Sequence, residues 1–262
     1  MLSGTNSACW VVAPLWTRYE CAHATCDDES TVTASDYDSF ADAYSAENES
    51  NLFNRYYERP AMLRLTGDVS GRRILDAGCG SGLLSAALRA KGAVVTGFDS
   101  SAAMVDLARQ RLGEDAELYV ADLAAPLPFA DAKFDDVVAS LVLHYLEDWA
   151  GTLAELRRVL KSGGRLIVSV NHPAAYAIVY PDAEYFALTK YSEEYTFDGQ
   201  SAVLTFWHRP LHAMADAFAA AGFRIATISE PPPAPDTPPD LLPPNMDGRS
   251  FLCFLFFVLE PV

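Results

Sequence analysis

Between residues 72 and 171 the chain alternates short apolar runs with amphipathic segments. The apolar runs have the length and composition of strands, and the segments between them place apolar residues at helical spacing. Short strands separated by amphipathic helices predict βαβ units, and therefore an α/β fold with a parallel sheet. We expect strands at 72–77, 93–99, 116–121, 134–141 and 165–171, and helices at 82–91, 101–112 and 148–160.

The chain before this alternation divides into two parts. Residues 1–35 show no sustained period and end in a polar run, so we expect a weakly ordered N-terminal extension. From Tyr37 the pattern becomes helical, because Tyr37, Phe40 and Tyr44 fall on one helix face. A second helix is expected from about Leu52 to Leu65. Residues 36–262 are therefore predicted to form a single domain, which begins with a helical segment at 36–70.

A different pattern begins after the fifth predicted strand. Two alternating segments flank Asp198-Gly199, a pair that suits a type I′ turn. We therefore predict a β-hairpin inside an insertion at 172–209. Beyond this insertion we expect a helix at 210–221 and two strands, at 223–230 and 251–260, which bring the sheet to seven strands.

Composition and charge restrict the partners of this chain. Half of the 262 residues are hydrophobic, yet no apolar run approaches the about 18 residues of a membrane helix. The formal net charge is −16 with only 19 basic residues, whereas a nucleic-acid surface needs clustered lysine and arginine. We therefore expect neither nucleic acid nor a membrane as a partner. The start of the chain lacks the basic segment of a secretory signal, so the predicted location is the cytoplasm.

The five cysteines are an odd number, which favours reduced thiols. Cys21, His23 and Cys26 could supply three metal ligands, but no second cysteine pair accompanies them. The competing interpretation, an extension without a metal, is the one we favour. No metal site is predicted.

Three glycines, Gly78, Gly80 and Gly82, follow the first predicted strand in the segment RILDAGCGSGLL. A loop at this edge of an open α/β sheet can bind a ligand, because without Cβ atoms its backbone amides lie directly against the ligand. The dinucleotide fingerprint G-x-G-x-x-G requires a glycine where this chain has Leu83, which argues against NAD. The pattern D-x-G-x-G-x-G, with Asp76 in front, is the alternative.

This second pattern resembles motif I of the class I S-adenosylmethionine (SAM)-dependent methyltransferases. Asp99 and Asp122 end the second and third strands, where that family places acidic residues. The segments FDDVVASLVLHYLEDW and LRRVLKSGGRLIVSV are similar to the family's fourth strand, helix and fifth strand. The resemblance covers about residues 37–259 and is closest to the small-molecule enzymes of the ubiquinone/menaquinone-biosynthesis type. It implies a Rossmann-like fold, with helices on both faces of the sheet, and SAM as the cofactor.

The resemblance also implies roles around the cofactor. Asp99 would accept from the ribose hydroxyls and Asp122 from the adenine amino group, whereas Asp76 would orient the loop and meet the methionine amino group. Met104 either packs on the adenine or belongs to the core, and the segment 36–70 either covers the cofactor as a lid or simply packs on the sheet. The full set of predicted cofactor residues is Tyr37, Tyr44, Asp76, Ala77, Gly78, Gly80, Gly82, Asp99, Ser100, Met104, Ala121, Asp122, Leu123 and Ser140.

Two histidines follow strands at the ligand-binding edge and are the candidate general bases. His144 comes after the fourth strand and His172 directly after the fifth, and the competing interpretation of each is a structural hydrogen bond. His208 and His212 are treated as surface residues. The insertion is dense in aromatic residues, which either line an apolar acceptor pocket or form a small core. Those predicted to bind the acceptor are Tyr176, Tyr180, Tyr195 and Trp207.

The sequence therefore predicts transfer of a methyl group from SAM to a small molecule by in-line displacement. A hydroxyl of an aromatic or lipophilic metabolite is the favoured acceptor, since a phenol of pKa roughly 10 needs only modest help from a base. The alternative function is a SAM-binding scaffold or a cyclase-type enzyme on the same fold. A monomer or a homodimer is expected.

Overall fold

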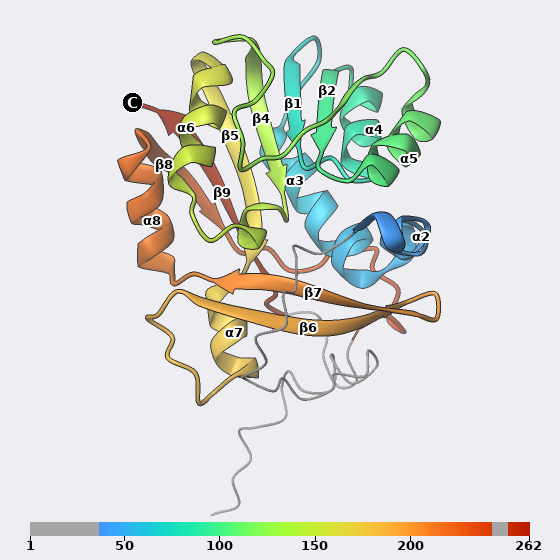
Figure 1. Ribbon diagram of the computed structural model, residues 1–262, viewed down its shortest axis with the longest axis vertical. Coiled ribbons are helices and arrows are strands. Elements are labelled where there is room, and N and C mark those ends of the chain that lie inside the picture. The colour runs from blue at the N-terminus through green and yellow to red at the C-terminus, as the bar shows by residue number, and fades with distance from the viewer. Residues whose placement is uncertain (1–36, 243–250) are drawn as a thin grey trace, which may run out of the picture.

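A computed structural model describes residues 37–242 and 251–262, so the predicted extension at 1–35, with its Cys21-His23-Cys26 cluster, lies outside the described residues. Strands alternate with helices along the described chain, as predicted (Figure 1). The main sheet consists of β1 (Arg73–Ala77), β2 (Val94–Asp99), β3 (Glu117–Val120), β4 (Phe134–Ser140), β5 (Leu160–Asn171), β8 (Phe223–Ser229) and β9 (Phe254–Pro261).

The strands of this sheet follow the order β3-β2-β1-β4-β5-β9-β8. β9 runs antiparallel to both of its neighbours, and the remaining pairs are parallel. The predicted seven-stranded, mostly parallel sheet is confirmed. Because β1 to β5 point the same way, their carboxyl ends meet at one edge, where open α/β sheets bind ligands.

The helices lie close to their predicted positions, with two differences. The expected helix at 52–65 is divided into a π-helical turn, η2 (Asn54–Glu58), and α3 (Arg59–Thr66), whose first turn contains Pro60. The helix α7 (Pro173–Val179) was not predicted; His172 caps it and Pro173 begins it. The other helices are η1 (Tyr37–Ser39), α2 (Ala41–Ser50), α4 (Leu83–Ala90), α5 (Ala102–Leu112), η3 (Leu143–Tyr145), α6 (Ala150–Val159) and α8 (Leu211–Ala220).

Alternate residues of the central strands pack into two separate cores. On one face, Leu75 and Val137 pack with residues of α6 and α8. On the other face, Ile74 and Val138 pack with residues of α3 and α4. Helices therefore cover both faces of the sheet, as expected from side chains that alternate along a strand.

The predicted turn at 161–164 is part of β5 rather than a break before it. Phe134 of β4 pairs with Leu160 of β5, and Asp136 pairs with Arg165. Between these two pairs β5 therefore contains more residues than β4 does. A β-bulge absorbs the extra residues without ending the strand.

The hairpin forms a ribbon of two antiparallel strands, β6 (Thr189–Phe197) and β7 (Gln200–His208), around Asp198-Gly199. Both turn residues have positive φ, 47° and 77°, as a type I′ turn requires. In Figure 1 the ribbon crosses beneath the carboxyl ends of the strands. A third apolar cluster joins the ribbon to α2, with the rings of Phe40 and Phe197 stacked at 5.6 Å.

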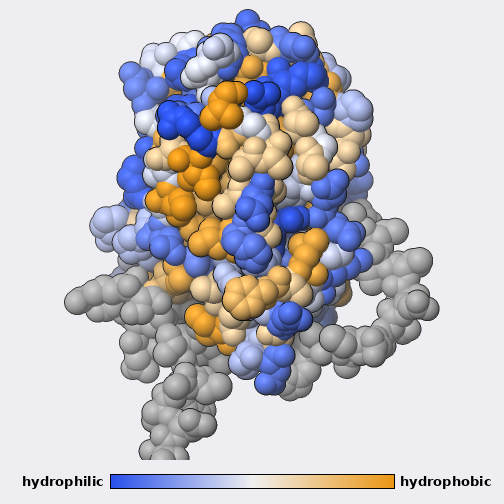
Figure 2. All heavy atoms as spheres, turned by 90° about the vertical axis from the view of Figure 1, so that its left-hand side faces the viewer, coloured by the Kyte–Doolittle hydropathy of each residue, from blue (hydrophilic) through white to orange (hydrophobic). Residues whose placement is uncertain are grey.

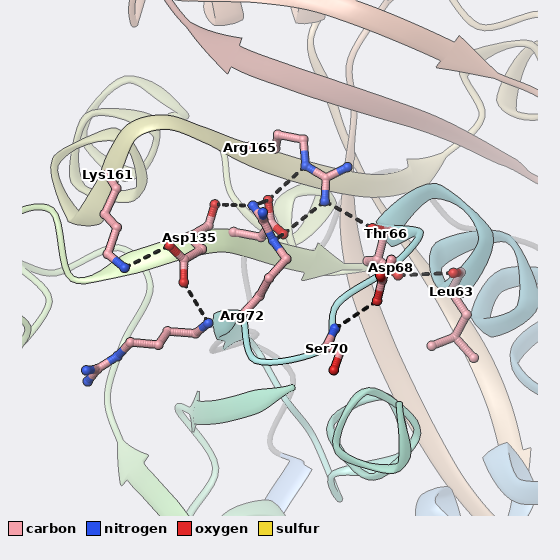
Figure 3. A network of polar contacts seen from close by, with 10 residues as sticks. Leu63, Thr66, Asp68, Ser70, Arg72, Asp135, Lys161 and Arg165 are labelled. Atoms are coloured by element: carbon pink, nitrogen blue, oxygen red, sulfur yellow. Dashed lines mark hydrogen bonds and ion pairs between the residues drawn. The ribbon is translucent and has the colours of Figure 1, made fainter. Parts of the chain in front are cut away.

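A network of charged side chains ties together the strands at the opposite, amino edge of the sheet (Figure 3). The fully buried carboxylate of Asp136 accepts hydrogen bonds from Arg72 Nε at 2.6 Å and Arg165 Nε at 2.9 Å. Beside it, Lys161 Nζ donates to Asp135 Oδ1 at 2.7 Å. The carboxylates of Asp135 and Asp136 therefore each have an opposite charge within hydrogen-bond distance.

The surface on the side of α8 and β8 mixes hydrophobic with hydrophilic residues (Figure 2). On the edge strand β8, for example, the side chain of Ile228 is 51% exposed. Among residues 37–242 and 251–262, no helix combines the length and the apolar character that crossing a membrane requires.

Candidate functional site

A cavity of about 250 Å³ opens at the carboxyl edge of the sheet, and we call it the loop cavity. The glycine loop forms one wall, the ends of β1, β2 and β4 form its base, and α2 and η2 lie on its other side. The predicted cofactor residues that line it are Tyr37, Tyr44, Asp76, Gly78, Gly80, Asp99, Ser100, Met104, Ala121, Asp122, Leu123 and Ser140.

Two of the predicted cofactor residues do not line the loop cavity. Ala77 is fully buried at the end of β1. Gly82 has φ of +81°, and a Cβ at this position would approach the Cβ of Ala108 in α5 to 3.2 Å. The absence of a side chain at Gly82 therefore serves the contact between the loop and α5 rather than contact with a ligand.

The glycine loop is held in place by the carboxylate at the end of β2. Gly80 N donates to Asp99 Oδ2 at 2.9 Å, and Ser101 N donates to Asp99 Oδ1 at 3.0 Å. Gly80 has φ of +51°, and a Cβ there would meet no atom within 4 Å. The backbone of Gly80 thus faces open space beside the half-buried carboxylate of Asp99, which suits a ligand that lies against the peptide plane.

Asp76 is buried in the floor of the loop cavity, with 1% of its surface exposed. Its Oδ2 accepts from Ser85 Oγ at 2.6 Å, whereas Oδ1 has no hydrogen-bond partner among the described residues. Burial, with a smaller effect of the neighbouring charges of Glu58 and Asp99, raises the pKa of Asp76 to about 7. An unpaired buried carboxylate oxygen is costly, and a hydrogen-bond donor from a ligand would remove that cost.

A second buried carboxylate, Glu58, was not predicted from the sequence. It ends the π-helical turn η2 and is 3% exposed, and its Oε1 accepts from Ser140 Oγ and Ser169 Oγ, each at 2.7 Å. Burial raises the pKa of this carboxyl as well. Single-turn π-helices recur at functional sites, but the sequence of a helix does not indicate where one will form.

The segment 37–50 is fastened over the loop cavity by polar contacts. Ser45 Oγ donates to Ser81 Oγ in the glycine loop at 2.8 Å, and Asp38 accepts from Ala103 N at the start of α5 at 3.0 Å. The hydroxyl of Tyr37 hydrogen-bonds that of Tyr145, across the cavity from α2. These contacts hold the segment against the glycine loop, the start of α5 and η3.

A second cavity, of about 140 Å³, lies between the ribbon, α7 and α2, and we call it the hairpin cavity. It shares the lining residues Tyr44, Asn48, Asn54, Leu141 and Tyr145 with the loop cavity, so the two cavities adjoin. Tyr176, Tyr180 and Tyr195, the residues predicted to bind the acceptor, line it together with both candidate bases.

Trp207 does not line either cavity. Its neighbour Phe206 lines the hairpin cavity, and adjacent residues of a strand point to opposite faces. Trp207 is therefore on the outer face of the ribbon. His208, expected at the surface, is buried: its ring stacks on Tyr176 at 4.0 Å and its Nε2 donates to the carbonyl oxygen of Tyr185 at 2.7 Å.

The hydrogen bonds of the two candidate bases favour structural roles. His172 Nδ1 accepts from Ala174 N at 3.0 Å, so Nε2 carries the hydrogen and donates to Glu230 Oε1 at 2.6 Å. His144 Nδ1 accepts from Asn171 N at 3.2 Å, and burial lowers the pKa of His144 to about 3. Neither ring presents a nitrogen lone pair to a ligand, which argues against the predicted base role of both.

The sequence interpretation missed residues that lie far from the glycine loop along the chain. Arg59 and Asn54 line the loop cavity, and Glu193 lines the hairpin cavity. Glu193 is 6% exposed in a strand whose neighbouring Glu194 is exposed. The alternation of the ribbon therefore contained a signal, since Glu193 shares its face with Tyr191 and Tyr195. Within the described residues, no cluster of three His, Cys, Asp or Glu side chains could hold a metal ion.

The segment of the chain that forms much of this site is similar in sequence to known proteins. Residues 75–168 match a family described as "Methyltransferase domain". The chain is 40% identical over 134 residues to a demethylmenaquinone methyltransferase of Clavibacter sepedonicus, covering 50% of this chain and 55% of the relative. It is 39% identical over 108 residues to a malonyl-[acyl-carrier protein] O-methyltransferase of Serratia marcescens, covering 41% of this chain and 42% of the relative. The chain thus spans about half the length of the curated relatives it matches.

A solved structure extends the likeness beyond the matched segment. The crystal structure of a putative S-adenosylmethionine dependent methyltransferase from Listeria monocytogenes aligns with a TM-score of 0.64 at 22% identity. The alignment covers 78% of this chain and 96% of that chain. At this identity the likeness concerns the fold.

Proposed function

We propose that this chain is a class I SAM-dependent methyltransferase that transfers the methyl group of SAM to a small-molecule acceptor in the hairpin cavity. The observation that carries the proposal is the pair of adjoining cavities at the carboxyl edge of the sheet. One is lined by acidic side chains and a glycine loop, and the other mainly by aromatic rings.

The residues of the loop cavity fit SAM in charge and in shape. SAM carries a sulfonium and an ammonium group against one carboxylate, so its net charge is positive. The cavity is lined by four acidic side chains and one arginine, Arg59. Asp76 Oδ1 lacks a partner and suits an ammonium donor, while the open space at Gly80 suits a group that lies on the loop.

The individual roles follow from position in the cavity. Asp99 would accept hydrogen bonds from the ribose hydroxyls, each contributing roughly 1.5–3 kcal/mol, and Asp122 and Met104 would border the adenine. Arg59 would pair with the cofactor's carboxylate. The segment with Tyr37 and Tyr44 would act as the lid. When bound, SAM supplies an activated methyl group on its sulfonium, and the protein aligns the acceptor with it.

The hairpin cavity supports a planar aromatic acceptor. Tyr176, Tyr191, Phe206 and the neighbouring rings provide flat apolar walls, and pockets of this kind bind flat organic molecules. The two relatives described above act, by their names, on a demethylmenaquinone and on a malonyl-[acyl-carrier protein]. We propose a phenol- or quinol-like acceptor that is methylated on a hydroxyl.

Three further expectations belong to this proposal. The acceptor is a small molecule and not a nucleic acid, in keeping with the net charge of −16. The protein acts in the cytoplasm. It is a monomer or a homodimer, which size-exclusion chromatography with light scattering would distinguish.

The test has two steps. Titration calorimetry with SAM and with its demethylated product, S-adenosylhomocysteine (SAH), should show binding of both. Incubation with SAM and a panel of phenols and quinols, followed by mass spectrometry, should yield a product heavier by one methylene unit and an equal amount of SAH. Binding without any SAH formation across the panel would favour a scaffold, and absence of binding would contradict the proposal.

A further inference from the structure

Glu193 is a buried acidic side chain in the middle of an aromatic cavity. It lies on β6, lines the hairpin cavity and is 6% exposed. Its Oε1 accepts from Tyr180 OH at 2.9 Å, and its Oε2 accepts from Tyr195 OH. Within the described residues, none of the groups that shift the pKa of Glu193 is a cation.

This arrangement is unusual for a purely structural acid. Buried carboxylates are ordinarily paired with a cation, because the desolvation of an unpaired charge is costly. Here two neutral hydroxyls are the partners, and burial raises the pKa of the Glu193 carboxyl. A carboxylate with these surroundings is a stronger proton acceptor than one in water.

The other candidate proton acceptors of the cavity are already engaged. The Nδ1 atoms of His144 and His172 accept backbone hydrogen bonds, and His172 Nε2 donates to Glu230. The tyrosines Tyr191 and Tyr195 have pKa values raised by burial, so they keep their protons at neutral pH. The carboxylate of Glu193 accepts one hydrogen bond at each oxygen and has further lone pairs. It is therefore the buried group of this cavity that can still accept a proton.

We propose that Glu193 is the catalytic base of the methyl transfer and accepts the proton of an O–H group on the acceptor; this inference rests on the proposed function. As the acceptor oxygen forms a bond to the methyl carbon, the carbon–sulfur bond breaks and its electron pair remains on sulfur. The O–H bond breaks and the proton moves to the Glu193 carboxylate. The products are the methyl ether, SAH and a neutral Glu193, which returns its proton to solvent after release. Tyr180 and Tyr195 are positioning residues that hold the carboxylate.

The first experiment measures recognition of the O–H group without needing the true acceptor. Phenol and anisole differ only in that anisole lacks the hydroxyl hydrogen. In the presence of saturating SAH, the wild-type protein should bind phenol about tenfold more tightly than anisole, the difference expected for one hydrogen bond to a carboxylate. Ligand-observed NMR titration can measure such weak binding.

The variants then locate the source of this preference. Glu193→Gln keeps the shape and an oxygen for the two tyrosines, and it should lose the preference. Glu194→Gln is the matched control, because the neighbouring side chain is exposed on the opposite face of β6. Glu47→Gln tests the other acidic side chain of the hairpin cavity. Equal preference in Glu193→Gln and wild type, loss in Glu47→Gln instead, or no preference in the wild type would each overturn the proposal.

The second experiment measures the turnover number, kcat. With any phenol of the panel that the wild type methylates, Glu193→Gln should lower kcat by about 10²-fold or more, the usual range for a lost general base, with an unchanged Kd for SAM. An unchanged kcat would overturn the assignment. If SAH does not bind the wild type, the proposed function itself fails. If SAH binds and only the Glu193 effects are absent, the methyltransferase proposal stands and Glu193 is not its base.

Discussion

At the amino edge of the sheet, where β1, β4 and β5 begin, the carboxylate of Asp136 lies between two arginines. At the carboxyl edge, where the same strands end, the buried carboxylates of Glu58 and Asp76 receive hydrogen bonds from serine hydroxyls instead. The side chains in both networks lie on the face of the sheet that α3 covers. The two edges therefore differ in charge balance and not in burial.

Helix α3 connects the two edges directly. Glu58 precedes its first residue and hydrogen-bonds Ser140 and Ser169 at the ends of β4 and β5. At its other end, Thr66 O accepts from Arg165 Nη2 at 3.0 Å (Figure 3). The neutralised edge can thus stabilise the strands and α3, whereas the loop cavity at the other edge is lined by four acidic side chains and one arginine, Arg59.

The largest expected effect is at the neutralised edge. Asp136→Ala leaves Arg72 and Arg165, whose side chains are 33% and 25% exposed, without their shared carboxylate. Breaking a fully buried pair costs about 3–5 kcal/mol of unfolding free energy, and this partly exposed one should cost up to that amount. Urea denaturation would measure the loss. A variant as stable as the wild type would show that this network does not hold the strands together.

The next effect is a pH dependence at the carboxyl edge. The pKa of Asp76 is about 7 in the folded protein, against an ordinary value of 3.8 for an aspartate in water. The folded state therefore holds this proton at pH values where the unfolded state has lost it, and ligand-free stability should fall as pH rises from about 4 towards 7. Relative to the wild type, Asp76→Asn should gain about 2–3 kcal/mol between pH 5 and pH 7, since each pH unit is worth about 1.4 kcal/mol. Denaturant titrations at several pH values would measure the unfolding free energy of both proteins. The same dependence on pH in the wild type and in Asp76→Asn would contradict this prediction.

A smaller effect concerns binding. Asp99→Ala removes the proposed acceptor for the ribose hydroxyls and should weaken SAM and SAH binding by about 1.5–3 kcal/mol, which is roughly ten- to a hundredfold. The variant also loses the bond from Gly80 N, so thermal unfolding is measured alongside calorimetry. If the folded variant bound SAM and SAH with unchanged affinity, Asp99 would not be a cofactor-binding residue.

The smallest effect is expected at the surface of the neutralised edge. Lys161 and Asp135 form an ion pair whose side chains are 40% and 27% exposed, and Lys161 lowers the pKa of Asp135. Lys161→Gln should cost less than about 1 kcal/mol. The cost should disappear in high salt, and also in acid, where Asp135 is protonated. If Lys161→Gln cost as much unfolding free energy as Asp136→Ala, solvent exposure would not explain the difference expected between these two ion pairs.

The sheet and the glycine loop could be predicted because their signals are local. The alternation of apolar runs indicated every strand of the sheet, and Gly78, Gly80, Asp99 and Asp122 stand at strand ends, where the parallel fold brings them together. Gly82 shows the limit of such reasoning. The same residue type in the same motif serves a helix contact, which depends on where α5 packs.

Two buried acidic side chains that line the cavities, Glu58 and Glu193, were harder to predict. Glu58 becomes a cavity residue through a π-helical turn and two serines more than 80 residues away. Glu193 could be found from the alternation of β6, but its chemistry depends on Tyr180 of the segment after α7. For the two histidines the structure argues against the predicted base role, because their Nδ1 lone pairs accept from backbone amides that the sequence does not reveal.

The most direct test of the account is proton release on SAM binding. Calorimetric titrations at pH 7 in two buffers with different ionisation enthalpies measure the number of protons exchanged. If the positive charge of SAM meets Asp76, binding lowers the pKa of this carboxyl from about 7, and roughly half a proton should be released in the wild type and much less in Asp76→Asn. Binding with equal proton release in both proteins, or no SAM binding at all, would contradict the account.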